Sequence, residues 1–145
     1  QLDPDYLNEY YFKTMHHEFA HILNQTKPFS TDFNAISGPD YVTDTWSDAW
    51  DDDADAQKNG FISAYASSEA NEDFVELMSI YVTNPASYWN NIIKNAGEGA
   101  AKINAKFEIV YNYMLNSWNI DLNELRDVIQ ERQAQIGTLD LETLN

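Results

Sequence analysis

Apolar residues recur at helical spacing over most of this chain. The clearest case is the stretch 68–82, in which four apolar residues stand at i, i+3, i+4 and i+7: Phe74, Leu77, Met78 and Tyr81. Residues three and four apart lie on one face of an α-helix, so this stripe predicts a helix that packs on a core. Asn84 and Pro85 are residues that end a helix.

The first 28 residues predict one long helix. Asp3 can cap its start, Pro4 suits its first turn, and Pro28 marks its end. All three histidines of the chain fall in this predicted helix. The helix is therefore the first place to look for chemistry.

The C-terminal part of the chain predicts three further helices. A short one follows Pro85, and a longer one follows the glycines near position 98. The longer helix has five apolar residues on one face: Ile103, Phe107, Val110, Met114 and Trp118. Asp121 and Glu124 resemble a capping box that opens the last helix. Three residues of that helix are predicted to point inward: Leu125, Val128 and Ile129.

The middle of the chain, residues 27–67, lacks sustained periodicity and is rich in Gly, Pro, Ser, Thr and Asp. It predicts a long irregular insertion, in which FISAYA at 61–66 is a candidate short strand. A structureless span of this length inside a compact domain usually has a function. With no internal repeat and no dividing linker, the pattern predicts a single, mainly α domain over residues 1–145.

The composition narrows the classes of protein. A chain of 145 residues that is 43% hydrophobic can bury a core, which argues against disorder. Its net charge of −16 would repel nucleic acids and anionic membranes, and it has no apolar run of transmembrane length. The absence of cysteine excludes disulfides and thiolate zinc sites. Since the chain starts at Gln1 without a signal peptide, we expect a processed or trimmed piece.

His17, Glu18 and His21 form the pattern H-E-x-x-H within the first predicted helix. Two histidines four residues apart lie on one face, so both imidazoles can bind one ion. Glu18 lies beside that pair, where a general base would act on a bound water. The alternative is a pair of histidines on a polar helix face. His16 points elsewhere and is predicted to pack or to support the site from behind.

A catalytic zinc normally takes three protein ligands. The metzincin pattern would need glycine at position 24 and histidine at position 27, but the chain has Asn24 and Lys27. A carboxylate from another helix is the remaining common solution, and Glu72 is the best candidate. Glu76, one turn later, would accept the free ring N–H of a ligand histidine. The alternative is that both glutamates are solvated.

The segments HEFAHILNQ and GFISAYASSEANEDFVELMS resemble the gluzincin-type zinc-binding metallopeptidase family of Bacteroidetes lipoproteins, over Met15 to Ile80. The resemblance implies Zn²⁺, a peptide or protein substrate, and Glu72 as third ligand with Glu76 behind it. In related branches a tyrosine seven residues before this glutamate stabilises the oxyanion, a position that Tyr65 occupies here. The resemblance also implies an outer-membrane lipoprotein at the cell surface or in the periplasm, beside a substrate import complex.

Two features depart from that family pattern. Gluzincins place a β-sheet before the active-site helix, but only 16 residues precede His17, so this subdomain is absent from the chain. The stretch between His21 and Glu72 is also much longer than in thermolysin-like members. We therefore expect a zincin-like helix packed on the helix of the third ligand, without the sheet that aligns a peptide.

Alternate acidic residues between positions 51 and 55 suggest a calcium loop: Asp51, Asp53 and Asp55. An EF-hand would need glycine at position 56 and glutamate at position 62, but the chain has Ala56 and Ile62. We predict a solvated acidic loop, with an irregular calcium site as the alternative.

Three classes of function fit these patterns. The first is a zinc metallopeptidase. The second is a non-catalytic, metal-containing surface module that captures glycan or peptide, for which four aromatic residues could form a platform if they are not core: Trp46, Trp50, Tyr88 and Trp89. The third is a structural zinc site that clamps two helices. Glu18 argues against the third class, because a structural site needs no general base.

Overall fold

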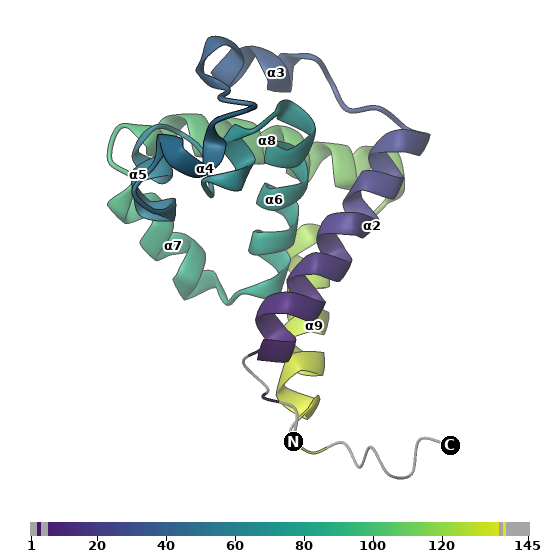
Figure 1. The fold of residues 1–145 in the computed structure, drawn as a ribbon. Coiled ribbons are helices and arrows are strands. Elements are labelled where there is room, and N and C mark those ends of the chain that lie inside the picture. The colour runs from purple at the N-terminus through teal and green to yellow at the C-terminus, as the bar shows by residue number, and fades with distance from the viewer. Residues whose placement is uncertain (1–2, 4–5, 137, 139–145) are drawn as a thin grey trace.

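The computed structural model describes residues 3, 6–136 and 138, and these residues form a helical fold (Figure 1). The N-terminal elements are the π-helix η1 (Leu7–Phe12) and helix α2 (Lys13–Thr26). The middle elements are α3 (Asp32–Ser37), the 3₁₀ helix η2 (Gly38–Asp40), α4 (Trp46–Ala49), α5 (Asp53–Lys58) and the 3₁₀ helix η3 (Tyr65–Ser67). The C-terminal elements are α6 (Ala70–Thr83), α7 (Ala86–Asn95), α8 (Gly99–Trp118) and α9 (Leu122–Ile136). The described residues contain no strand, which confirms the prediction of a mainly α fold.

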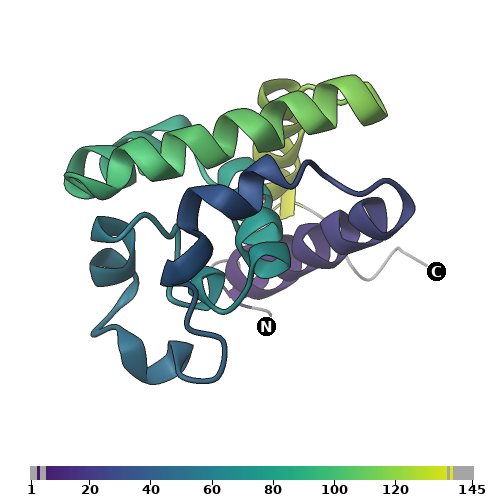
Figure 2. The same cartoon turned by 90° about the horizontal axis from the view of Figure 1, so that it is seen from above.

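The central element is α6, which lies between α2 and α8 (Figures 1 and 2) and also packs against α9. The predicted stripe of α6 is buried. Of the five predicted apolar residues of α8, Ile103, Val110 and Met114 are buried, and the other two are partly buried against the core. Neighbours on several sides bury nearly the whole of α6 from Asp73 onward. Polar side chains of α6 are therefore enclosed as well, and each needs a partner.

The first helix is close to its prediction. The chain runs from η1 into α2 without leaving helical geometry, and α2 ends at Thr26, two residues before Pro28. The predicted role of Pro4 lies outside the described residues. On its outer side α2 exposes three apolar side chains, those of Met15, Phe19 and Ile22.

The prediction of a strand at 61–66 is wrong. Phe61 and Ile62 are buried, but their backbone enters turns, and η3 begins at Tyr65. The N–H of Phe61 donates to the carbonyl of Ala56, so turns satisfy backbone groups that a strand would pair with a neighbour. The insertion is likewise less irregular than predicted, because it contains α3, α4 and α5.

In α9 the prediction is wrong for one of the three residues expected to point inward. Val128 is 52% exposed, whereas Ile129 is buried and Leu125 partly buried. Arg126 takes the inward position instead, with Nε donating to the carbonyl of Tyr81 and the guanidinium 3.6 Å above the Tyr81 ring. The side chain of Asp121 accepts the N–H of Glu124, which confirms the predicted cap. None of the described helices has the length and apolar character that crossing a membrane requires.

Candidate metal centre

Helices α2 and α6 bring His17, His21 and Glu72 together. His17 Nε2 lies 3.0 Å from Glu72 Oε2, and His21 Nε2 lies 3.2 Å from the same oxygen. One ligand atom from each residue lies within 4.8 Å of the other two, and no other such group is found in the described part of the chain. Ligands of a tetrahedral zinc with bonds near 2 Å stand about 3.3 Å apart. Two imidazoles and a carboxylate at this spacing match the donor set of a catalytic zinc.

Glu76 lies behind His17, away from the ligand atoms. Its Oε2 is 3.3 Å from His17 Nδ1, and its Oε1 accepts the hydroxyl of Ser63 at 3.0 Å. Lys13 Nζ approaches Oε1 at 3.4 Å, and the glutamate is only 3% exposed. With Nδ1–H donated to Glu76, the lone pair of His17 lies on Nε2, which faces Glu72.

Nearby carboxylates offset the effect of burial on the pKa of His17. Burial disfavours the imidazolium, but the hydrogen bond that His17 donates to Glu76 and the charges of Glu76, Glu72 and Glu18 outweigh this effect and raise the pKa of His17. Burial acts against the carboxylate of Glu76 too, yet His17 and Lys13 hold the pKa of Glu76 below its usual range. The field at this centre therefore favours positive charge, which a metal ion supplies.

Tyr65 and Glu18 flank the centre on different elements. The Tyr65 ring lies 6.0 Å from the His17 ring and meets the edge of Trp46 at 5.0 Å. Burial, with the charge of Glu72, raises the pKa of Tyr65, so its hydroxyl keeps its proton and can donate. Glu18 is exposed on α2, directly after His17. The structure thus gathers all six predicted site residues at one place, while their roles stay predictions.

His16 lies outside this group. Its Nδ1 is 2.6 Å from the carbonyl of Phe12, and burial lowers the pKa of His16. The predicted packing role fits this contact, and His16 offers a matched control for experiments on His17 and His21.

Residues 1–123 match the sequence model of a protein family described as "putative zinc-binding metallo-peptidase". The chain belongs to this family. A crystal structure from Bacteroides caccae, described by the same phrase, is similar to this fold with a TM-score of 0.91 and 40% sequence identity. The match covers 99% of this chain and 56% of that one, so the chain spans little more than half the length of this relative. A search of curated proteins gives no match.

The acidic stretch of this metallopeptidase-family chain supports local structure. Asp52 caps α5 by accepting the N–H of Asp55, and Asp53 accepts the N–H of Ala64 at 2.8 Å. Ala56 is fully buried in α5, so the stretch is a short capped helix as well as a solvated acidic surface. Asp51 and Asp53 are exposed, as the prediction of a solvated loop requires.

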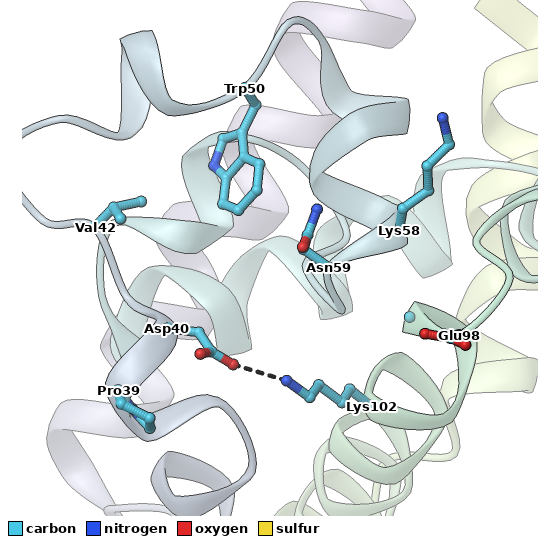
Figure 3. Close-up of a pocket in the computed structure, with 9 residues that line it drawn as sticks. Pro39, Asp40, Val42, Trp50, Lys58, Asn59, Glu98 and Lys102 are labelled. Atoms are coloured by element: carbon cyan, nitrogen blue, oxygen red, sulfur yellow. Dashed lines mark hydrogen bonds and ion pairs between the residues drawn. The ribbon is translucent and has the colours of Figure 1, made fainter.

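A separate hollow of about 560 Å³ shares no residue with the histidine–glutamate group. Figure 3 shows Trp50 on one wall and the ion pair of Lys102 with Asp40 on another, while Lys58 points outward. The other predicted platform residues are dispersed: Trp89 is buried, Tyr88 is exposed on α7, and Trp46 packs on Tyr65. Trp89 therefore cannot belong to the surface platform that the second class of function would need.

Two side-chain interactions near the site were not predicted from the sequence. Ser63, which orients Glu76, has no signal in the sequence beyond its place near Tyr65. The other is a buried pair, Asp73 with Lys106, whose Oδ2 and Nζ lie 2.6 Å apart. Tyr41 donates to the same carboxylate at 2.8 Å, and burial raises the pKa of Asp73 to about 6. A lysine one turn from Ile103 on the apolar face of α8 was the available signal.

Proposed function

We propose that this protein is a zinc-dependent metallopeptidase, which hydrolyses peptide bonds with Glu18 as general base. The observation that carries the proposal is the convergence of His17, His21 and Glu72 at zinc-like spacing, beside an exposed glutamate. Membership of a family described as zinc-binding metallo-peptidases supports it. A site that only clamped two helices would have no use for Glu18.

The chemistry divides among the residues of the centre. His17, His21 and Glu72 would hold the ion, which when bound lowers the pKa of water towards 7 and polarises a carbonyl. Glu18 takes the proton of the attacking water and later gives it to the leaving amine. Tyr65 donates a hydrogen bond to the oxygen on which negative charge develops. Glu76 and Ser63 hold the His17 ring in one orientation.

We expect the purified protein to bind about one equivalent of zinc. His21→Ala removes one of three ligands and should lose that zinc at concentrations where the wild type is saturated, as elemental analysis after dialysis will show. His16→Ala is the matched control, because it removes an imidazole from the same helix but outside the group. Loss of zinc from His16→Ala with retention in His21→Ala would refute the ligand assignment. A zinc-loaded full-length protein that cleaves nothing in a mixed peptide library would refute the peptidase.

Tyr65→Phe should lower kcat by roughly 10–1000-fold, the range for loss of one oxyanion donor, with little change in KM. The reason is that the hydroxyl acts most strongly in the transition state. Steady-state kinetics on a quenched fluorescent peptide measures both constants. Tyr88→Phe, which alters an exposed tyrosine of α7, is the control and should leave kcat unchanged. Equal kcat values for the two variants would remove Tyr65 from the mechanism.

A further inference from the structure

A polar trough begins at His21 and runs along the junction of α2 and α6. Its first pocket, about 240 Å³, is lined by five residues: His21, Asn24, Gln25, Glu69 and Asn71. Its second pocket, about 150 Å³, is lined by Asn24, Pro28, Phe29, Thr31, Asn34 and Asn71. Each is smaller than the roughly 300–1,000 Å³ of pockets for drug-sized ligands, and so has the size for one side chain.

His21 connects the trough to the proposed metal centre, because it belongs to both. His21 belongs to its first pocket and also lies 3.2 Å from Glu72 through Nε2. An extended peptide advances about 3.3 Å per residue, so a bond held at the centre places a neighbouring side chain at this pocket. The charge of Glu69 also acts on Tyr65, which places this carboxylate on the same side of the molecule.

Asn24 is a polar residue of the trough whose side chain the fold leaves without a partner among the described residues. Asn24 Nδ2 and Oδ1 are both buried without a hydrogen-bond partner among the described residues. A buried amide without partners is unfavourable, so a ligand that forms hydrogen bonds with it gains from the contact. Asn24 lines both pockets, so a ligand in either one can reach this amide. Glu69 precedes α6 but makes no capping bond with its side chain.

The charge of the trough selects the ligand. Glu69 is its one carboxylate, and neither pocket is lined by a lysine or arginine. Lys27, the nearest basic residue in the sequence, donates to the carbonyl of Ser117 and lies over the Trp118 ring instead. In the first turn of α6, Glu72 belongs to the proposed ligand set and Asp73 pairs with Lys106. Glu69 therefore supplies the charge of the trough itself, in a chain whose net charge is −16. Such a field favours a cation over a neutral or acidic side chain.

We infer that this trough is the specificity subsite of the proposed peptidase, and that it binds the side chain of an arginine or lysine adjacent to the scissile bond. This inference rests on the proposed function. The Glu69 carboxylate forms a charge-assisted pair with the basic group. The carbonyl oxygens of the Asn24, Asn71 and Gln25 side chains accept the remaining N–H donors, of which a guanidinium has five.

Binding to the full-length Glu18→Gln variant tests the subsite without turnover. The probes are fluorescein-labelled alanine pentapeptides with arginine at each position in turn, and the same peptides with citrulline, which keeps the shape but not the charge. We expect one arginine position to bind about tenfold more tightly than its citrulline counterpart, the ratio that 1.4 kcal/mol gives. Adding Glu69→Gln should abolish this ratio. Adding Glu108→Gln, the same charge change at an exposed position of α8, should preserve it.

Two outcomes overturn the inference. One is that no arginine position differs from citrulline. The other is that Glu108→Gln reduces the ratio as much as Glu69→Gln, which would show attraction by the overall charge alone. Cleavage of the same peptides by the wild-type protein separates this inference from the proposed function. Cleavage without a preference for arginine sinks only the subsite, whereas a Glu69-dependent preference in binding without any cleavage sinks only the peptidase.

Discussion

Glu18→Gln in the full-length protein should lower kcat for peptide hydrolysis by about 10²–10⁴-fold, the range for loss of a general acid–base group. Glutamine keeps the shape of glutamate but cannot take a proton from water. The ligand triangle contains no atom of Glu18, so about one equivalent of zinc should remain bound. Kinetics on a quenched fluorescent peptide and elemental analysis of the same sample measure the two quantities together.

Glu108→Gln serves as the control for Glu18→Gln, because it removes one exposed carboxylate far along the chain from the centre. Its kcat and its zinc content should equal those of the wild type. A Glu18→Gln variant that cleaved peptide at a rate near the wild type would exclude this hydrolytic mechanism. Loss of zinc from Glu18→Gln would instead identify Glu18 as a ligand.

The histidine pair was predictable because its geometry is local. An α-helix places residues four apart on one face whatever surrounds it, so His17 and His21 had to converge once α2 formed. The partner Glu72 stands 51 residues after His21, and no local rule fixes such a pairing. Its prediction depended on two glutamates one turn apart, and on the resemblance of that segment to a known family.

The wrong predictions concern features that tertiary packing determines. FISAYA contains Phe61, Ile62 and Tyr65, residue types that favour strands, but no neighbouring strand exists among the described residues to pair with it. Which residues of α9 are buried depends on how the helix packs against α6. Arg126 lies over the Tyr81 ring, whereas Val128 is exposed. The burial of Glu76 also depends on Ser63 and Lys13, which come from other elements.

The buried pair of Lys106 with Asp73 leads to the largest expected effect on stability. Lys106→Met should lower the free energy of unfolding by about 3–5 kcal/mol, the range for removing one partner of a buried ion pair. The substitution leaves the Asp73 carboxylate buried with Tyr41 alone, and also removes the bond from Nζ to the carbonyl of Gly60. Urea denaturation followed by circular dichroism, in the presence of EDTA so that zinc binding does not contribute, measures the loss.

Two further variants separate the pair from a simple loss of lysine. Lys102→Met removes a lysine one turn away on α8, whose partner Asp40 is exposed, so it should cost at most about 1 kcal/mol. Lys106→Met with Asp73→Asn removes both charges and keeps an oxygen that can accept the Tyr41 hydroxyl. The double variant should therefore be more stable than Lys106→Met alone, because no uncompensated charge stays in the core. If the double variant were less stable than Lys106→Met, the cost would lie in lost packing around α6 rather than in an unpaired carboxylate.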